Sequence, residues 1–194
     1  MASDWRSIPN LITLTRLASM PVFIALLWRH QPFAALVLFA AAMASDVLDG
    51  VLARLLHQQT RLGALLDPLA DKALLVTGLV ALVGAGRAPA WLLGLVLLRD
   101  FTVAGGALEV RRRKLGDRLE PTRIGKYATF ALTCQIVLAL AGLAVDWPLF
   151  DAYAAVMAFI AGLCVAVSTA QYLARIGVLL AGSGRGTSVR TTKQ

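Results

Sequence analysis

Charged residues are scarce in this sequence. Only 15% of its 194 residues are Asp, Glu, Lys or Arg, whereas 58% are hydrophobic. A soluble globular domain usually has about a quarter of its residues charged. The low charge content therefore indicates that a lipid bilayer, rather than water, surrounds most of the chain.

Cysteine is rare in the sequence, and the features of a removable signal peptide are missing from its start. The two cysteines, Cys134 and Cys164, both stand within apolar stretches, where a cysteine usually behaves as a small buried hydrophobe. We therefore expect neither a disulfide nor a metal thiolate. The start of the chain, MASDWRSIPN, lacks the basic region, short apolar core and small-residue cleavage site of a removable signal peptide. The first apolar segment is expected to remain as a membrane anchor.

Acidic residues are fewer than basic ones, which gives a net charge of +8. Such an excess is compatible with nucleic-acid binding, but the apolar stretches favour a membrane protein that meets anionic lipid headgroups and phosphorylated substrates. We expect no nucleic-acid partner.

Long apolar runs make up most of the chain. A bilayer core requires about 20 mainly apolar residues for each helix. Segments of that length lie near 9–28, 33–56, 64–85, 90–110, 124–145 and 149–180. The sequence therefore predicts an all-α polytopic membrane domain of six transmembrane helices over residues 1–181. Residues 182–194, rich in Gly, Ser, Thr and Arg, are predicted to form a flexible basic tail.

The distribution of Lys and Arg predicts the orientation in the membrane. Basic residues gather at the chain start, around the second connection, between Arg111 and Lys126, and near the chain end. The first and third connections hold only Arg29 and Arg87, and the fifth holds neither Lys nor Arg. Cytoplasmic flanks of membrane proteins carry the positive excess. We therefore expect a protein of a bacterial-type inner membrane with both termini on the cytoplasmic side.

Four aspartates interrupt the apolar pattern. Asp46 and Asp49 are three residues apart at the end of the second segment, and Asp67 and Asp71 are four apart at the start of the third. Each pair shares one helix face, and the short link over 57–63 makes the two helices antiparallel neighbours. Carboxylates at membrane depth mark function by default. Converging oxygen ligands suit Mg²⁺ or Mn²⁺, so we predict a divalent-metal site at the cytoplasmic side.

Small residues accompany the aspartates. Gly50 and Ala53 keep the acidic face of the second helix narrow, and Gly63 permits a close approach where the third helix begins. This leaves room for a nucleotide. Small residues also allow ordinary tight packing between helices in lipid. The glycines alone therefore do not decide between a nucleotide site and simple helix packing.

The pattern Asp46-x2-Asp49-Gly50-x2-Ala53-Arg54-x8-Gly63-x3-Asp67-x3-Asp71 resembles the signature of the CDP-alcohol phosphotransferase family at each of its eight fixed positions. The resemblance implies a fold of six transmembrane helices, usually a homodimer, with the active site at the cytoplasmic side. It also implies that the four aspartates bind one or two Mg²⁺ or Mn²⁺ ions that hold the CDP pyrophosphate, and that Asp71 is the general base.

The opening Pro9-Asn10-x2-Thr13-x2-Arg16 resembles the branches of the family that make phosphatidylglycerol phosphate and cardiolipin. Pro9 and Thr13 are also compatible with a simple helix start, in which a polar side chain satisfies the first amides. The residues expected to contact the nucleotide are Asn10, Arg16, Asp49, Gly50, Ala53, Arg54 and Gly63.

Basic residues later in the chain are candidates for binding the acceptor alcohol. Gly125-Lys126 at the entry to the fifth helix resembles branches with phosphorylated acceptors, and a doubly charged phosphate needs several donors. We expect acceptor contacts from Lys126, Arg123, Arg175 and Arg112, although snorkelling to the membrane surface is the alternative for each. Arg99-Asp100 is either a structural ion pair within the fourth helix or part of this pocket.

The function predicted from these residues is metal-dependent transfer of a phosphatidyl group from CDP-diacylglycerol to glycerol 3-phosphate, with release of CMP. The first alternative is a cardiolipin synthase with phosphatidylglycerol as acceptor. A more distant alternative is a non-catalytic membrane protein for divalent cations, but a transporter usually holds its ion near the bilayer midplane, whereas these aspartates stand at helix ends.

Overall fold

The structure, a computed structural model, describes residues 8–55, 63–112 and 122–185, with side chains for 13–45, 67–110, 112 and 122–179. The described residues form α-helices joined by short connections. These are α1 (Ile8–Trp28), α2 (Pro32–Leu55), α3 (Gly63–Gly84), α4 (Ala90–Arg112), α5 (Arg123–Val145) and α6 (Pro148–Arg185). The six apolar segments predicted from the sequence are therefore confirmed as helices, with most ends within two residues.

Local sequence signals explain several of the helix ends. Pro32 and Pro148 begin α2 and α6, where the missing amide hydrogen of proline costs nothing. The Thr122 side chain caps α5 by accepting a hydrogen bond from the Gly125 amide at 3.0 Å. Asp146 ends α5 in a left-handed conformation, with φ 52°, which Asp tolerates better than most residues.

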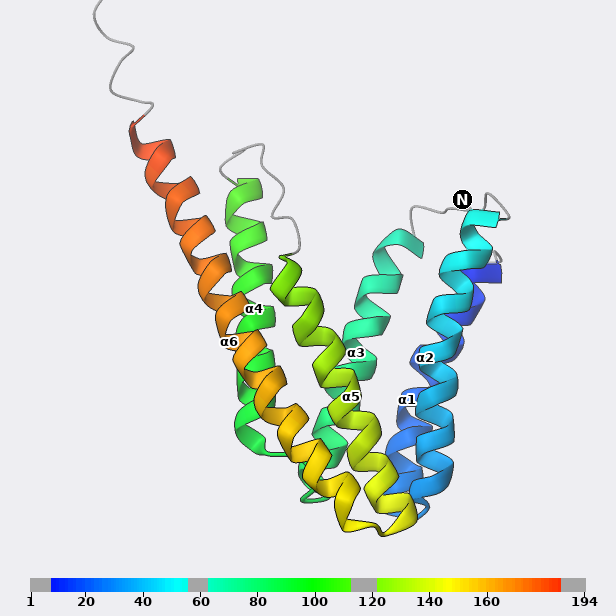
Figure 1. Ribbon diagram of the computed structural model, residues 1–194. Coiled ribbons are helices and arrows are strands. Elements are labelled where there is room, and N and C mark those ends of the chain that lie inside the picture. The colour runs from blue at the N-terminus through cyan, green and yellow to red at the C-terminus, as the bar shows by residue number, and fades with distance from the viewer. Residues whose placement is uncertain (1–7, 56–62, 113–121, 186–194) are drawn as a thin grey trace, which may run out of the picture.

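The helices run up and down between two ends of the molecule, which are unlike each other (Figure 1). The 28–32, 84–90 and 145–148 connections all lie at one end, which we call the connection end, and there the helices converge. The starts of α1, α3 and α5 and the ends of α2, α4 and α6 lie at the other end, where the helices spread apart. We call this the open end.

The buried core lies between the helices and is almost entirely apolar. Phe23 of α1 and Phe39 of α2 form a tilted ring pair with centroids 5.7 Å apart, and a Cβ on Gly78 of α3 would lie 3.0 Å from the Phe39 ring. Ile136 and Leu140 bring α5 into the same cluster. The outer faces remain apolar as well, with exposed residues such as Phe101, Phe130 and Phe159, as expected of a surface that meets lipid.

Three stretches within the described residues are long and apolar enough to cross a bilayer, namely Ala90–Val110, Arg123–Val145 and Pro148–Leu179. Shorter apolar stretches cover Thr13–Trp28 and Pro32–Ser45. The all-helical architecture predicted from the sequence is thus confirmed, and its apolar stretches are consistent with a membrane protein. The predicted tail over 182–194 overlaps the last turn of α6, and its residues 186–194 lie outside the described part.

Candidate functional site

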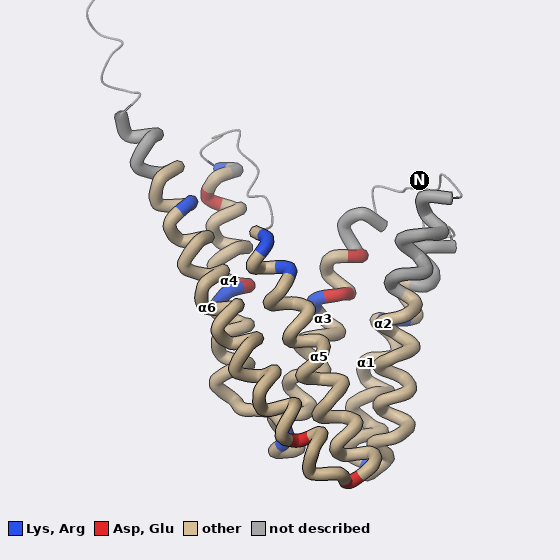
Figure 2. The backbone as a smooth tube through the Cα atoms, viewed as in Figure 1, with Lys and Arg blue, Asp and Glu red and all other residues tan. Residues whose placement is uncertain are grey.

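Charged residues lie near both ends of the bundle, and a few, such as Arg99 and Asp100 of α4, lie farther along the helices (Figure 2). At the open end, the start of α3 carries Asp67 and Asp71, and the start of α5 carries Arg123 and Lys126. Helices α3 and α5 pack against each other. The fold therefore brings acidic and basic residues that are far apart in the sequence to the same end of the molecule.

Asp67 is held by a residue from another helix. Thr13 of α1 is completely buried, and its hydroxyl donates a 2.7 Å hydrogen bond to Oδ1 of Asp67. A buried hydroxyl bonded to a carboxylate fixes the orientation of that carboxylate, because charge-assisted hydrogen bonds of this kind are short and strong. The sequence had suggested only that Thr13 satisfies the first amides of its own helix. Its contact with Asp67 depends on the packing of α1 against α3.

The four predicted metal ligands are described to different extents. Asp67 and Asp71 are both partly buried on α3, and their four-residue spacing places them on one face of the helix. The helix α2 runs through Asp46 and Asp49, but their side chains lie outside the described part. Among the described side chains, no group of three or more His, Cys, Asp and Glu is close enough to hold a metal ion.

Most of the predicted nucleotide contacts also fall outside the described side chains. The positions of Asn10, Gly50, Ala53, Arg54 and Gly63 are helical, and nothing further is described of them. Arg16 is described: it lies on α1, one turn after Thr13, and is only 2% exposed. It lines a hollow of about 310 Å³ between α1 and α2 together with small residues such as Ser19 and Ala42.

The start of α5 is fixed by a buried hydrogen-bond network that the sequence did not indicate. The Thr122 hydroxyl lies 3.3 Å from that of Ser168 on α6, and the Thr122 amide donates to the Tyr172 hydroxyl at 3.3 Å. These bonds attach the entry of α5 to α6. Arg123 and Lys126, which follow directly, are exposed and therefore project from a rigid base.

Arg99 of α4 belongs to this same region. Its Nη2 donates to the Gly125 carbonyl at 3.5 Å, and a Cβ on Gly125 would lie 3.0 Å from that nitrogen. Gly125 leaves room for this approach of Arg99, since a larger residue there would make the guanidinium shift. The remaining predicted acceptor residues, Arg112 and Arg175, are exposed on α4 and α6.

The interpretation of Arg99 and Asp100 as an ion pair with each other is wrong. Asp100 instead pairs with Lys72 of α3, with 2.8 Å between Nζ and Oδ1, while Arg99 turns toward α5. Neighbouring residues on a helix point about 100° apart, so each side chain reaches a different neighbouring helix.

Comparison with known proteins identifies the family of the chain. A profile of the CDP-alcohol phosphatidyltransferase family matches residues 6–168. The chain belongs to this family. The match includes α1 to α5 and more than half of α6. It therefore contains the four predicted metal ligands and the basic start of α5.

Individual relatives of the chain carry two kinds of name. The chain is 39% identical over 141 residues to a CDP-diacylglycerol–glycerol-3-phosphate 3-phosphatidyltransferase of Cereibacter sphaeroides, covering 69% of this chain and 61% of the relative. It is 34% identical over 140 residues to the protein of that name in Bacillus subtilis, covering 64% and 72%. A putative cardiolipin synthase of Mycobacterium bovis is 37% identical over 125 residues, covering 64% and 59%. The matched region thus spans only part of each relative's length.

The described aspartates at the start of α3 fit a divalent cation by their donor chemistry. Carboxylate oxygens are the ligands that hard cations such as Mg²⁺ prefer, and Asp67 is already oriented by Thr13. A carboxylate within an otherwise apolar helix is costly unless it has a charged or hydrogen-bonding partner. A bound cation would add a positive charge beside Asp67 and Asp71.

Proposed function

We propose that this protein transfers the phosphatidyl group of CDP-diacylglycerol to the hydroxyl of glycerol 3-phosphate and releases CMP. The observation that carries the proposal is that the aspartate-bearing start of α3 and the basic start of α5 lie at the same end of the bundle. A reaction between a pyrophosphate and a phosphorylated alcohol requires metal-binding carboxylates and phosphate-binding cations close together. The names of the relatives in Cereibacter and Bacillus support the same reaction.

The aspartates of α2 and α3 have the central role in this proposal. Asp46, Asp49, Asp67 and Asp71 would hold Mg²⁺ or Mn²⁺, which when bound neutralises negative charge on the pyrophosphate and makes CMP a better leaving group. Asp71 acts as general base and takes the proton of the acceptor hydroxyl. The acceptor oxygen forms a new bond to the phosphatidyl phosphorus as the bond from that phosphorus to the CMP oxygen breaks. The proton ends on Asp71.

The nucleotide is proposed to lie over the end of α2 and the start of α1. The small side chains of Gly50, Ala53 and Gly63 would give room to the cytidine part. The proposed polar contacts to the nucleotide phosphates are Asn10, Arg16, Asp49 and Arg54. The burial of Arg16 within an apolar helix supports a role beyond a simple surface charge.

The acceptor phosphate is proposed to lie at the start of α5. Lys126 and Arg123 are its main ligands, because both are exposed on the rigid base formed by the Thr122 network. Arg99 is a further candidate, since it reaches the same turn of α5. Arg175 and Arg112 would add positive charge from α6 and α4. Several cations suit a doubly charged phosphate better than a neutral alcohol.

Cardiolipin synthesis, with phosphatidylglycerol as acceptor, is the second candidate. The relative in Mycobacterium bovis named a putative cardiolipin synthase supports it. Phosphatidylglycerol carries a phosphodiester with one negative charge, so it needs fewer cations than glycerol 3-phosphate. The number of basic residues around α5 therefore favours glycerol 3-phosphate. A non-catalytic role in cation transport is disfavoured because the chain belongs to a family of transferases.

We also propose how the protein is oriented in the membrane. All six helices would span a bacterial-type inner membrane, with the open end, the active site and both termini in the cytoplasm. The region over 1–181 would be the catalytic domain, followed by a basic tail over 182–194 that touches anionic lipid. We also propose a homodimer, by analogy with the family.

The proposal is tested by measuring CMP release from CDP-diacylglycerol and glycerol 3-phosphate by the purified protein. We expect release that requires Mg²⁺ or Mn²⁺ and falls about 100-fold or more in Asp71→Asn, because a general base typically contributes that much. Asp146→Asn is the matched control, since Asp146 lies exposed at the connection end and Asn tolerates its left-handed backbone. Equal activity of Asp71→Asn and the unmodified protein would reject Asp71 as the base.

A further inference from the structure

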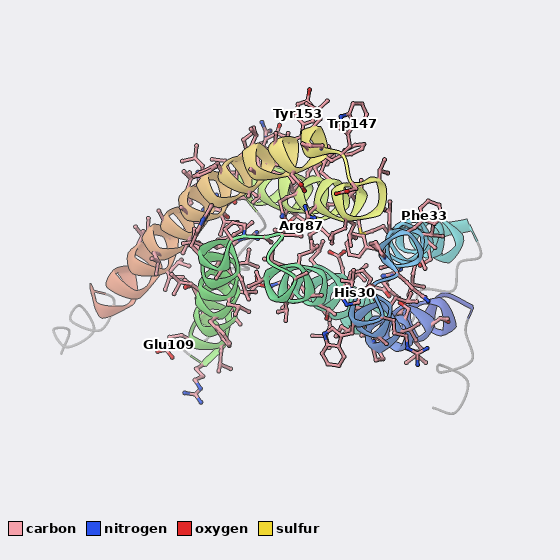
Figure 3. All side chains as sticks on the ribbon, turned by 90° about the horizontal axis from the view of Figure 1, so that it is seen from below. His30, Phe33, Arg87, Glu109, Trp147 and Tyr153 are labelled. Atoms are coloured by element: carbon pink, nitrogen blue, oxygen red, sulfur yellow. The ribbon has the colours of Figure 1, made fainter. Side chains whose placement is uncertain are left out.

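A second cavity, of about 570 Å³, lies at the connection end of the bundle, away from the proposed metal ligands Asp67 and Asp71. The α3–α4 connection forms one side of it and α5 and α6 form the other. Figure 3 looks at this end and shows Arg87 between the α3–α4 connection and the α5–α6 pair. The proposed transfer reaction uses none of the residues that line this cavity.

The cavity contains a buried amide that lacks a partner. Gln135 of α5 lines it and is only 1% exposed. Within the described part of the protein, neither its Nε2 nor its Oε1 has a hydrogen-bond partner. Leaving a buried amide unpaired costs free energy, and such groups in native proteins usually have a water or ligand as partner. An apolar residue at this position would avoid that cost.

The mouth of the cavity carries a charged pair. Arg87 Nη1 donates to Asp151 Oδ2 at 2.6 Å, and the two side chains remain 32% and 44% exposed. This bond uses one of the five N–H donors of the guanidinium. The other donors of Arg87 are available to an anionic oxygen, while Asp151 holds the arginine in place.

The remaining wall is apolar and aromatic. Trp91 and Phe159 form a tilted ring pair with centroids 5.5 Å apart, and the small side chains of Ala154 and Ala158 leave space on the α6 side of the cavity. The lining therefore offers a cation, an amide that can both donate and accept, and an apolar wall for a hydrocarbon chain. An amphiphile that carries an anionic group, a hydroxyl and an acyl chain fits these three features.

We propose that this cavity binds a monoacyl glycerophospholipid. Its phosphodiester contacts Arg87, its free backbone hydroxyl pairs with Gln135, and its single acyl chain lies along Trp91 and Phe159. The hydroxyl is the deciding group, because it can accept from Nε2 and donate to Oε1, whereas the ester oxygens of a diacyl lipid only accept. The glycerol backbone of a lipid lies deeper in the membrane than its phosphate, as the positions of Gln135 and Arg87 require. The site is separate from the transfer reaction.

The test compares two probes that differ by one hydroxyl. These are lysophosphatidylcholine with a brominated chain and its analogue without the backbone hydroxyl. The choline headgroup contains no hydroxyl of its own. Binding to the full-length protein in detergent is measured as bromine quenching of Trp91 fluorescence, after subtraction of the signal of Trp91→Phe. We expect the hydroxylated probe to bind about fivefold to tenfold more tightly, as the gain of a buried hydrogen bond predicts.

Variants assign that preference to Gln135. In Gln135→Leu the two probes should bind equally, and this variant should fold because it removes an unpaired buried amide. Gln171→Leu, which changes a partly buried glutamine of α6 that does not line the cavity, should keep the preference. Arg87→Gln should weaken both probes alike, since both carry the phosphodiester.

Three outcomes would overturn the proposal. Equal binding of the two probes by the unmodified protein would mean that water alone satisfies Gln135. A preference that survives in Gln135→Leu would place the hydroxyl elsewhere. Displacement of the probe by glycerol 3-phosphate at an equal concentration would assign the site to a small free phosphate rather than to a lipid.

Discussion

The hydrogen bond from Thr13 to Asp67 shows how one residue can orient a ligand of the proposed metal site. The bond is 2.7 Å long and its donor is completely buried, so the carboxylate is oriented before any ligand binds. Preorganised ligands save the cost of ordering them during binding. Thr13 is therefore a positioning residue in the proposed reaction, acting through Asp67.

Replacing Thr13 by valine removes this bond while keeping the shape of the side chain. We expect kcat/KM to fall about 10-fold to 100-fold, because a hydrogen bond to a charged group contributes about 1.5–3 kcal/mol. The Mg²⁺ concentration that gives half-maximal activity should rise as well, and Thr13→Ser should restore both values.

Thr133→Val is the matched control for this change, because the Thr133 hydroxyl bonds only within α5, to the Thr129 carbonyl at 3.0 Å. It should leave the Mg²⁺ dependence unaltered. An unchanged Mg²⁺ dependence in Thr13→Val would show that the bond to Asp67 does not position a metal ligand.

At the scale of the helices, the sequence predicts the elements well and their contacts poorly. Apolar runs with Pro and Gly at their borders are enough to place the helices. The partners of Arg99 and Lys72 are not predictable in this way, because they depend on how α3, α4 and α5 are rotated against each other. The Asp100–Lys72 pair and the Arg99–Gly125 contact join consecutive helices through residues 28 and 26 positions apart in the sequence. The spacing of the aspartates was informative because each pair lies within one helix.

The packing of α4 on α6 depends on a glycine. A Cβ on Gly162 would lie 2.4 Å from Cζ3 of Trp91, so Gly162→Ala should force the rigid indole ring away and lower the free energy of unfolding by about 1–3 kcal/mol. Gly94→Ala is the control, because a Cβ there meets nothing within 4 Å, and it should leave stability equal or slightly higher. Thermal unfolding in detergent measures both.

A second change separates the ring clash from other effects of Gly162→Ala. Adding Trp91→Leu to that variant gives the new methyl group space, so the double variant should be more stable than the sum of the single changes predicts. If Gly162→Ala unfolds at the same temperature as Gly94→Ala, the close contact of α4 with α6 at this glycine is refuted.

The molecule is polarised: Asp67, Asp71, Arg123 and Lys126 lie at the open end, and short connections join the helices at the other end. Because positive charge is retained in the cytoplasm, the open end is proposed to face inward. Cysteines introduced by Arg29→Cys and Ala85→Cys, in a chain with Cys134→Ala and Cys164→Ala, should react with a membrane-impermeant maleimide in intact cells. Lys126→Cys should react only after the membrane is opened. The reverse labelling pattern would contradict the proposed orientation.

The proposed reaction is defined by the alcohol that accepts the phosphatidyl group. The most direct measurement follows radiolabelled glycerol 3-phosphate and CMP together, with purified protein, CDP-diacylglycerol and Mg²⁺. We predict that the label enters the lipid fraction in a one-to-one ratio with CMP released, and that removal of the cation by a chelator stops both. Release of CMP that requires phosphatidylglycerol and leaves the label in the aqueous fraction would contradict glycerol 3-phosphate as the acceptor and favour cardiolipin synthesis.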